Sequence, residues 1–437
     1  MIAPALREQR IAVILPAAYL GGTLRLVLNL VRHVASREST RVVFAVPAEH
    51  VATIEDELAA LRADCPHVEV RGFRWRCLDR DAAVCCATAA GLEVGDYIST
   101  TYQIPTDAGT SFCDCDFWFF VSDRLAAPLI PLRPYGVLVT DHLQRYVPEI
   151  FEPAMYRNHD SVPWNFLRTV RNADVVVATS AGTADDVMTY AGALGRMVRM
   201  PTTVDIDHFL RLAANPAASE ERAAEPYFVW VTNSSEHKNH RRMLRALRQY
   251  YQVPGGRLDV VVTGLWTDLF DPDLPAERIG DRRAVWDCAY VREIRELIRT
   301  TLGGCRHRIH LRGALSDAEY VRVVRGARFL VHNVLADNGT YSVVEAAILG
   351  RPSMSSDYPQ MREIDRDFGL GMRFFDAYDA QDTARALRDG ESLPAAARPS
   401  GEMEAIIRRH GWRALDDALV TAIRDAIDSP RRAVTFL

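Results

Sequence analysis

The feature that most constrains this chain is an alternation of short apolar runs with longer amphipathic segments, which occurs twice. In the first half, strand-type runs lie at 11–16, 41–46, 97–101, 117–121, 135–140 and 175–179, and helical spacing recurs at 24–35, 54–62 and 184–191. After residue 226, strand-type runs lie at 227–232, 258–263, 309–312, 329–334 and 353–356, and helical segments at 239–250, 285–300, 317–325, 342–349 and 404–427. Because parallel strands are joined by crossover helices, this alternation predicts an α/β fold with two Rossmann-like domains built on parallel sheets.

The boundary between the two halves is predicted from composition. The segment 212–226 is rich in Ala, Glu and Pro and has little apolar periodicity, which is typical of a linker. A chain of 437 residues also exceeds the size of about 250–300 residues at which one compact domain stops growing. We therefore expect an N-terminal domain over 1–211, a C-terminal domain over 227–403, and a helical segment over 404–437 that packs back toward the first domain. The carboxyl ends of the two sets of strands would border an interdomain cleft.

Composition and charge exclude several classes of protein. Hydrophobic residues make up 48% and charged residues 25%, which rules out disordered and fibrous chains. The net charge of −5 gives no overall basic field, so no nucleic-acid partner is expected. No apolar run reaches the roughly 18 residues of a membrane span and the N-terminal run lacks a signal-peptide pattern, so we expect a cytoplasmic protein. The eight cysteines show neither CxxC nor zinc spacing, which favours reduced thiols over a disulfide framework.

A dense group of polar residues lies between a predicted strand and a predicted helix at 336–347 (ADNGTYSVVEAA). Its turn consists of Asn338, Gly339 and Thr340. Such a turn presents free backbone N–H groups at the start of a helix, which suit a diphosphate. Asp337 at the entrance of the turn could reach a sugar hydroxyl, and Glu345 could accept hydrogen bonds from ribose. The same letters also read as a capping box from Ser342 to Glu345, in which Glu345 would only cap its own helix.

A second group lies at 229–239 (VWVTNSSEHKN), again spanning a strand, a loop with Asn233, and a helix start. The 52 basic residues of the chain include a single lysine, Lys238; the others are arginine. The two types are nearly equivalent on exposed surfaces, but a compact ammonium differs from a guanidinium at a specific site. A lysine at a helix N-terminus also opposes the helix dipole. We therefore interpret Lys238 as a diphosphate-binding residue, with a solvated surface charge as the alternative.

Two shorter motifs follow strands of the first half. Gly21-Gly22 comes after the first strand and allows a ligand to approach the backbone closely, but it is not a GxGxxG fingerprint, which argues against a nicotinamide enzyme. Asp141-His142 follows the strand predicted at 135–140 and so belongs to the sheet edge where sites form. An isolated Asp-His pair is also often structural.

Together these residues resemble the retaining GT-B glycosyltransferases of family four, the nucleotide-sugar-dependent bacterial polysaccharide type, and within it the mannosyltransferases. That family carries two acids eight positions apart in E-G-F-G-x-P-x-x-E-A, matched in spacing by Asp337 and Glu345. Lys238-Asn239 matches its K-G or K-N, and 201–209 resembles its P-N-G-V-D…F. The chain departs from the family in its first acid, in the order Asp141-His142, and at Thr232 and His237, one of which would be the arginine that commonly accompanies the lysine.

The resemblance implies transfer of a hexosyl unit, with mannose from GDP-mannose as the leading candidate, to an acceptor hydroxyl in surface polysaccharide or glycoconjugate synthesis. The acceptor would be a saccharide or a lipid-linked saccharide, and the protein could associate peripherally with the inner face of the membrane. No cofactor and no metal are expected. The implied catalytic residues are Asp337, Lys238, Asp141 and His142. The implied nucleotide-sugar-binding residues are Gly21, Gly22, Asn233, Lys238, Asn338, Gly339, Thr340 and Glu345.

Two other functions are compatible with the same motifs. A sugar-nucleotide epimerase on the same fold would need no acceptor and would interconvert sugars. A non-catalytic nucleotide-sugar-binding partner subunit would bind the donor without turnover, which the departures at Asp337 and His237 make plausible.

Overall fold

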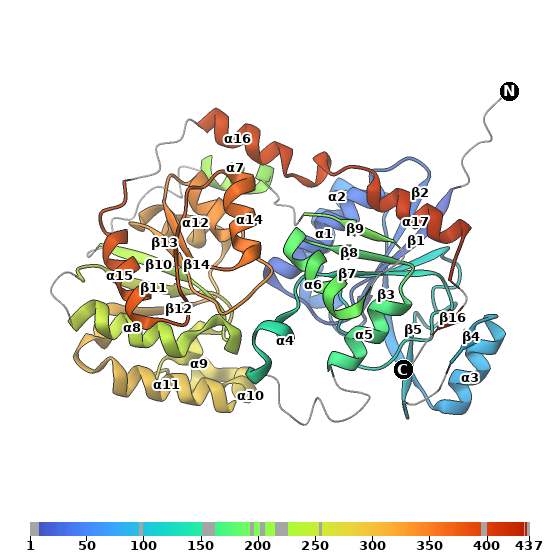
Figure 1. The fold of residues 1–437 in the computed structure, drawn as a ribbon, viewed down its shortest axis with the longest axis horizontal. Helices are drawn as coiled ribbons and strands as arrows, with labels where there is room; N and C mark the ends of the chain where they lie inside the picture. Colours follow the sequence, from blue (N-terminus) through green and yellow to red (C-terminus); the bar gives the residue numbers. More distant parts are fainter. Residues whose placement is uncertain are drawn as a thin grey trace. The chain divides into compact units, whose positions relative to one another are not determined.

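The protein is described by a computed structural model that covers residues 8–95, 99–150, 162–192, 196–201, 206–214, 226–252, 256–394, 400–431 and 433–434. The chain forms two compact units (Figure 1). Unit 1 comprises Met1–Gln144, Phe151–Asp205 and Arg408–Leu437, and unit 2 comprises Arg145–Ile150 and Ile206–Ile407.

Unit 1 is built on an eight-stranded sheet in the order β5-β3-β2-β1-β6-β7-β8-β9. Its strands are β1 (Gln9–Ile14), β2 (Thr40–Pro47), β3 (Glu69–Leu78), β5 (Tyr102–Thr106), β6 (Phe117–Phe120), β7 (Tyr135–Val139), β8 (Val175–Ala178) and β9 (Met197–Arg199). Neighbours pair in parallel except at one edge, where β5 is antiparallel to β3. The strand order reverses between β1 and β6, which is the switch point of a doubly wound sheet.

The prediction of a strand at 97–101 is corrected by this sheet. Residues 96–98 lie outside the described part of the chain, and the strand found nearby is β5, which begins at Tyr102. Its hydrogen bonds go to β3, from Arg74–Thr106 to Leu78–Tyr102. Its direction is set by this edge pairing, which apolar periodicity does not encode.

Helices cover both faces of the sheet in unit 1. They are α1 (Gly21–Ala35), α2 (Glu55–Asp64), α3 (Arg80–Ala89), α5 (Val162–Asn172), α6 (Ala181–Ala191) and α17 (Ala418–Asp428), with short segments η1 (Val51–Ile54), β4 (Glu93–Val94), η9 (Trp412–Ala414) and β16 (Ala433–Val434). Side chains of β1 alternate between two apolar layers, because successive residues of a strand point to opposite faces. Ile11 and Val13 pack in the layer of α1, α2 and α17, and Ile14 packs in the layer of α5 and α6.

Unit 2 is built on a six-stranded, wholly parallel sheet in the order β12-β11-β10-β13-β14-β15. Its strands are β10 (Tyr227–Val231), β11 (Asp259–Thr263), β12 (Ile309–Gly313), β13 (Leu330–His332), β14 (Ser353–Ser356) and β15 (Arg373–Phe375). The strand order reverses between β10 and β13. These two neighbours therefore form the switch point of the second sheet, and the loops that follow them share one edge.

Helices also cover both faces of the sheet in unit 2. The main ones are α7 (Ile206–Ala214), α8 (His240–Gln252), α11 (Ala289–Thr301), α12 (Asp317–Gly326), α13 (Ser342–Ile348), α14 (Pro359–Phe368), α15 (Ala380–Gly390) and α16 (Ser400–Arg409). Shorter segments are α4 (Leu143–Tyr146), which crosses the unit boundary, η2 (Pro148–Ile150), η5 (Glu236–Lys238), η6 (Thr267–Phe270), α9 (Ala276–Ile279), η7 (Gly280–Arg282), α10 (Arg283–Trp286) and η8 (Gly303–Arg308). Phe228 and Trp230 of β10 face α8, α11 and α15, whereas Val229 faces α12, α13 and α14. The predicted α/β fold with two parallel-sheet Rossmann-like domains is confirmed.

The unit boundaries differ in detail from those expected. Residue 211 lies inside α7, which belongs to unit 2, where Phe209 packs against Val321. Most of the expected linker, 215–225, lies outside the described residues, as does 202–205 of the motif at 201–209. The helix expected over 404–427 is broken into α16, η9 and α17, and α17 adds Leu419 and Ile423 to the core of unit 1.

Candidate functional site

The two polar motifs of the second half lie side by side at the carboxyl edge of the sheet in unit 2. One loop follows β10 and the other follows β13, its neighbour at the switch point. The backbone N–H of Leu335 donates a hydrogen bond to the carbonyl of His237 at 2.9 Å and so joins the two loops. Lys238 and Asp337, 99 positions apart in the sequence, form an ion pair there. The structure thus brings together two of the four predicted catalytic residues.

This ion pair is largely shielded from water. The side chains of Lys238 and Asp337 are 13% and 10% exposed. The second carboxylate oxygen of Asp337 accepts the backbone N–H of Asn338 at 2.8 Å. Burial is the strongest influence on the pKa of Asp337 and would raise it, but the Lys238 ammonium, His237 and His332 together outweigh it and lower the pKa to about 2. Asp337 is therefore a buried anion at neutral pH.

The loop that carries Lys238 is held in place by hydrogen bonds of the residues around Lys238. Asn239 has a left-handed backbone (φ 59°), and its side-chain amide donates to the Asn333 side chain at 2.9 Å and to the Ala377 carbonyl at 2.8 Å. His240 is buried, with one ring nitrogen 2.7 Å from the Tyr290 hydroxyl and the other 3.2 Å from Thr232 Oγ1. Asn233, the other predicted binding residue of this loop, accepts the Ser235 N–H at 2.9 Å. These bonds fix the direction from which Lys238 reaches Asp337.

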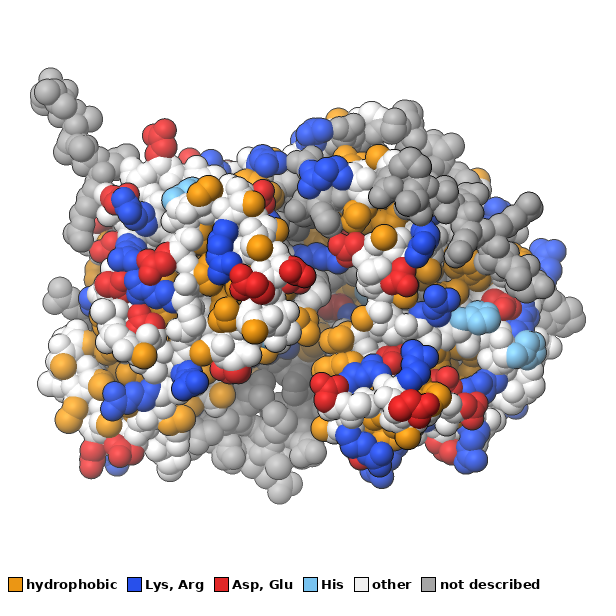
Figure 2. Space-filling model, turned by 180° about the vertical axis from the view of Figure 1, so that it is seen from behind, with side chains coloured by type: hydrophobic (Ala, Val, Ile, Leu, Met, Phe, Trp, Pro, Cys, Tyr) orange, Lys and Arg blue, Asp and Glu red, His pale blue; other side chains and the backbone are white. Residues whose placement is uncertain are grey.

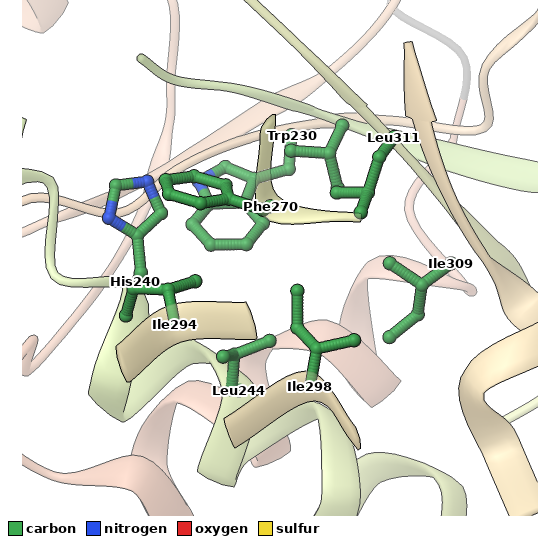
Figure 3. Close-up of a pocket in the computed structure, with 9 residues that line it drawn as sticks. Trp230, His240, Leu244, Phe270, Ile294, Ile298, Ile309 and Leu311 are labelled. Carbon is green, nitrogen blue, oxygen red and sulfur yellow. The ribbon is translucent and has the colours of Figure 1, made fainter. Parts of the chain in front are cut away.

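A small apolar pocket lies against His240 (Figure 3). Its lining comes from three strands, two helices and η6, and consists of Trp230, His240, Leu244, Val262, Phe270, Ile294, Ile298, Ile309 and Leu311. The His240 ring packs on Phe270, with ring centroids 4.7 Å apart. The pocket is apolar and separate from the ion pair, so we interpret it as a packing gap beneath the sheet.

The turn after Asp337 is built around Gly339. Its φ of +90° is unfavourable for other residues, and a Cβ there would stand 2.4 Å from Ile364 Cδ1. Thr340 follows, with its hydroxyl 2.9 Å from the Ser342 hydroxyl. The structure thus places Asn338, Gly339 and Thr340 where the sequence predicts them, between β13 and α13.

The capping-box alternative for Glu345 is wrong. Ser342 is the first residue of α13, and the N-cap position is held by Tyr341, which forms no side-chain cap. A capping box needs Ser or Thr at the N-cap, so the geometry is displaced by one residue. Glu345 is 8% exposed, and its carboxylate accepts a hydrogen bond from the Tyr320 hydroxyl of α12 at 2.7 Å. Its role as a ribose ligand stays a prediction.

Two buried residues on which the Asp337 charge acts were not identified from the sequence. His332, the last residue of β13, places Nε2 4.0 Å from the nearer oxygen of Asp337, and Tyr358 follows β14. Burial and the Lys238 charge lower the pKa of His332 to about 3, so its ring is neutral. Burial, and then the Asp337 charge, raise the pKa of Tyr358 well above its usual value. A histidine that ends an apolar strand five positions before Asp337 was the available signal.

The predicted residues of the first half lie at the carboxyl edge of the sheet in unit 1. Helix α1 begins at Gly21 (φ +61°) without a side-chain cap, and a Cβ at Gly21 or Gly22 would meet no atom within 4 Å. Asp141, after β7, forms an ion pair with Arg124. His142 is buried, with its ring centroid 4.3 Å from those of both Phe166 and Tyr190. Of the adjacent pair, Asp141 is therefore the one better placed to meet a ligand.

Asp123 is a further acid at this edge that sequence reasoning missed. It lies beyond β6, is 2% exposed, and one of its carboxylate oxygens has no hydrogen-bond partner among the residues that the structure describes. Burial is the main cause that raises its pKa to about 7, and the nearby Asp141 charge adds to it while Arg124 opposes it. The signal was a run of polar residues, 122–124, after a buried strand.

Three further observations on the described residues concern metal ions, membranes and surface charge. In that part of the chain, no group of three or more His, Cys, Asp or Glu is placed to hold a metal ion. None of its helices is long and apolar enough to cross a membrane. On the face shown in Figure 2, Lys and Arg side chains are interspersed with Asp and Glu over the described surface.

No protein-family model matches the sequence, and no curated protein is detectably similar to it. Solved structures do match it along nearly its whole length. HepE of Anabaena, in complex with UDP and glucose, is 15% identical with a TM-score of 0.60, covering 96% of this chain and 99% of that one. Sucrose-phosphate synthase of Thermosynechococcus elongatus is 15% identical with a TM-score of 0.61, covering 96% and 100%.

A third match is the α,α-trehalose 6-phosphate synthase of Burkholderia multivorans, which is 13% identical with a TM-score of 0.59 and covers 97% of this chain and 98% of that one. At such identities the likeness establishes the fold and not the activity. The chain therefore has the GT-B fold, with two Rossmann-like domains.

Proposed function

We propose that this chain is a glycosyltransferase that moves a hexosyl unit from a nucleoside-diphosphate sugar to an acceptor hydroxyl with retention of configuration. The observation that carries the proposal is the shielded Lys238–Asp337 pair at the switch point of unit 2. Ligands of doubly wound sheets bind at such points. The only lysine of the chain is placed there, beside a glycine turn.

Each residue of this edge has a role in the proposed reaction. Lys238 neutralises the negative charge that develops on the departing diphosphate, and one such contact is worth about 3–4 kcal/mol. Asp337 accepts a sugar hydroxyl and Glu345 accepts the ribose hydroxyls. The acceptor attacks the face that the diphosphate leaves, and the leaving phosphate helps to take the acceptor proton. Catalysis then consists of positioning and electrostatics, and needs no enzymatic nucleophile.

The donor and acceptor are proposed by class. The resemblance of the sequence motifs favours GDP-mannose, whereas HepE, which shares the fold, was solved with UDP and glucose and with UDP-glucose. Both donors carry the diphosphate that Lys238 would bind. We place the acceptor, a saccharide or lipid-linked saccharide, at the edge of unit 1 beside Asp141, and the activity in surface polysaccharide or glycoconjugate synthesis.

The test is a transfer assay with GDP-mannose and UDP-glucose and a panel of saccharide acceptors, following nucleoside diphosphate release and the anomeric configuration of the product by NMR. We expect acceptor-dependent release and an axial donor linkage that stays axial. Lys238→Ala should lower turnover by about 10²–10³-fold. Arg299→Ala is the matched control, because it removes one positive charge from an exposed ion pair on α11. Sugar interconversion without release would instead identify an epimerase, and binding without turnover a non-catalytic subunit.

A further inference from the structure

The Lys238–Asp337 pair sets a problem for any diphosphate that binds at this edge. The Lys238 ammonium is committed to the Asp337 carboxylate, and both side chains are at least 87% buried. If the ammonium moves to a diphosphate, the carboxylate stays behind in a shielded position. A buried charge stripped of its partner is strongly unfavourable unless other groups replace that partner.

Two buried polar groups close enough for the Asp337 charge to act on them have no hydrogen-bond partner of their own. They are Nε2 of His332 and the hydroxyl of Tyr358, judged over the residues that the structure describes. His332 Nε2 stands 4.0 Å from the Asp337 carboxylate, and the rings of His332 and Tyr358 are 6.3 Å apart. Native proteins rarely leave such groups unpaired. His240 is also buried, but both of its ring nitrogens have partners. Burial alone therefore does not explain why Nε2 of His332 has none.

The hydrogen bonds of His332 define which of its ring nitrogens carries no proton. Nδ1 lies 3.3 Å from the Ser355 hydroxyl, and that hydroxyl donates its hydrogen to the Ser356 carbonyl. Ser355 must therefore accept from Nδ1, which carries the ring proton. Nε2 is left with a lone pair facing the carboxylate, and it becomes a donor only when it takes up a second proton.

We propose that Tyr358 and His332 are the reserve partners of Asp337: when a nucleoside diphosphate draws Lys238 away, the Tyr358 hydroxyl and a newly protonated His332 take its place on the carboxylate. The inference rests on the proposed function for the identity of the anion, but the exchange of partners is a property of this cluster. The proton comes from solvent and is bound at Nε2. Diphosphate binding is thereby coupled to proton uptake.

The charges around His332 work in this direction. The groups that act on it are Lys238 and His237 from the loop after β10, Asp337 after its own strand, and Tyr358 after β14. Lys238 and His237 disfavour its protonation, while Asp337 favours it. Withdrawing the ammonium removes a repulsion and exposes an attraction, so both changes favour protonation of His332.

The first test needs no nucleotide. In Lys238→Met the ammonium is absent, so the Hε1 resonance of His332, identified by its loss in His332→Asn, should titrate with a midpoint above about pH 5, within the ordinary range of histidine. In the wild type it should stay neutral to below about pH 4. A His332 that stays neutral in folded Lys238→Met would overturn the exchange, whether or not any nucleotide binds.

The second test uses wild-type protein and nucleotide sugars, whose diphosphate does not titrate near neutrality. Calorimetry of GDP-mannose and UDP-glucose near pH 5.5 in buffers of different ionisation enthalpy measures the protons bound. We expect uptake approaching one proton, lost in His332→Asn, and an affinity about tenfold weaker in Tyr358→Phe, as for one hydrogen bond to a charge. Tyr251→Phe is the matched control, because it also removes a buried, unpartnered hydroxyl, on α8.

The outcomes separate the two proposals. Proton uptake that persists in His332→Asn, or equal effects of Tyr358→Phe and Tyr251→Phe, would overturn the partner exchange and leave the proposed function intact. Failure of both nucleotide sugars to bind folded wild-type protein would overturn the proposed function. In that case the titration of His332 in Lys238→Met still decides the exchange.

Discussion

Both sheets carry an ion pair at their carboxyl edge, and the two pairs differ in shielding and in place. In unit 1, Arg124 pairs with Asp141 across β6 and β7, and their side chains are 35% and 12% exposed. In unit 2, Lys238 pairs with Asp337 across β10 and β13, and their side chains are 13% and 10% exposed. The second pair straddles the switch point of its sheet, whereas the first lies one strand away from it.

The difference indicates which pair the fold depends on. Water reaches Arg124 and partly screens its pair, which therefore contributes less, while a pair shielded on both sides leaves an uncompensated charge when either partner is removed. Arginine is the basic residue everywhere else in this chain, and lysine stands only in the shielded pair. A compact ammonium can pass from a carboxylate to a phosphate more readily than a guanidinium fixed by several hydrogen bonds.

The sharpest way to break this comparison is to remove each cation. Lys238→Met should lower the free energy of unfolding by about 3 kcal/mol at pH 7, because Asp337 loses the Lys238 charge at a pH above the titration expected for His332. Arg124→Met should cost less, about 1 kcal/mol, because water reaches the Arg124 side chain. Urea unfolding followed by circular dichroism measures both. Adding Asp337→Asn to Lys238→Met should restore most of the loss, and equal losses for the two cations would contradict the distinction.

A pH dependence sharpens the comparison at the edge of unit 1. The pKa of Asp123 is raised from 3.8 to about 7, so the folded protein holds a proton that the unfolded chain releases, and stability from this group falls as pH rises through that window. Asp123→Asn should therefore gain about 2 kcal/mol relative to wild type between pH 5.5 and pH 8. Thermal unfolding across this range measures the gain, and a constant difference at every pH would contradict it.

The glycine turns of the two edges should also differ. Gly339→Ala introduces a Cβ at φ +90° and 2.4 Å from Ile364, and should lower the free energy of unfolding by about 2 kcal/mol. At Gly21 (φ +61°) a Cβ would meet no atom within 4 Å, so Gly21→Ala should lower the free energy of unfolding by about 1 kcal/mol. Urea unfolding compares them. A larger loss for Gly21→Ala would mean that the contact at Ile364 relaxes freely.

The smallest expected effect concerns Glu345. Glu345→Gln keeps an acceptor for the Tyr320 hydroxyl but removes the charge, so it should weaken nucleotide affinity several-fold, by about 1 kcal/mol, with little change in melting temperature. Calorimetry and thermal unfolding of the same samples check this. A lower melting temperature with unchanged affinity would assign Glu345 a structural role alone.

Much of the fold of unit 2 could be predicted because several of its strands, such as β10 and β11, are apolar runs bounded by polar or breaking residues. The predicted strand 353–356 matches β14, and 227–232 exceeds β10 by one residue. Lys238 and Asp337 could be expected together because parallel neighbours at a switch point share an edge. The antiparallel pairing of β5 and the assignment of α7 to unit 2 could not, because both depend on contacts distant in sequence.

The residues that were missed show where sequence patterns stop being informative. His332 ends the apolar strand β13 and Tyr358 is the N-cap residue of α14, and at both places a buried residue looks like part of the core. Each has a polar atom that is buried without a hydrogen-bond partner, in the surroundings of a buried carboxylate. That combination is visible only in three dimensions. The capping-box reading of Ser342 failed for a related reason, since a shift of one residue in the helix start changes the role of the whole motif.

The measurement that tests the central claim most directly is calorimetric titration of GDP, UDP, TDP and ADP against wild type, Lys238→Ala and Arg299→Ala. A diphosphate site at the edge of unit 2 predicts that one nucleotide binds wild type and Arg299→Ala alike, and that its binding to folded Lys238→Ala is weaker by at least about tenfold. Equal affinity in all three proteins, or no binding of any nucleotide to folded wild type, would contradict the assignment of Lys238 to a diphosphate.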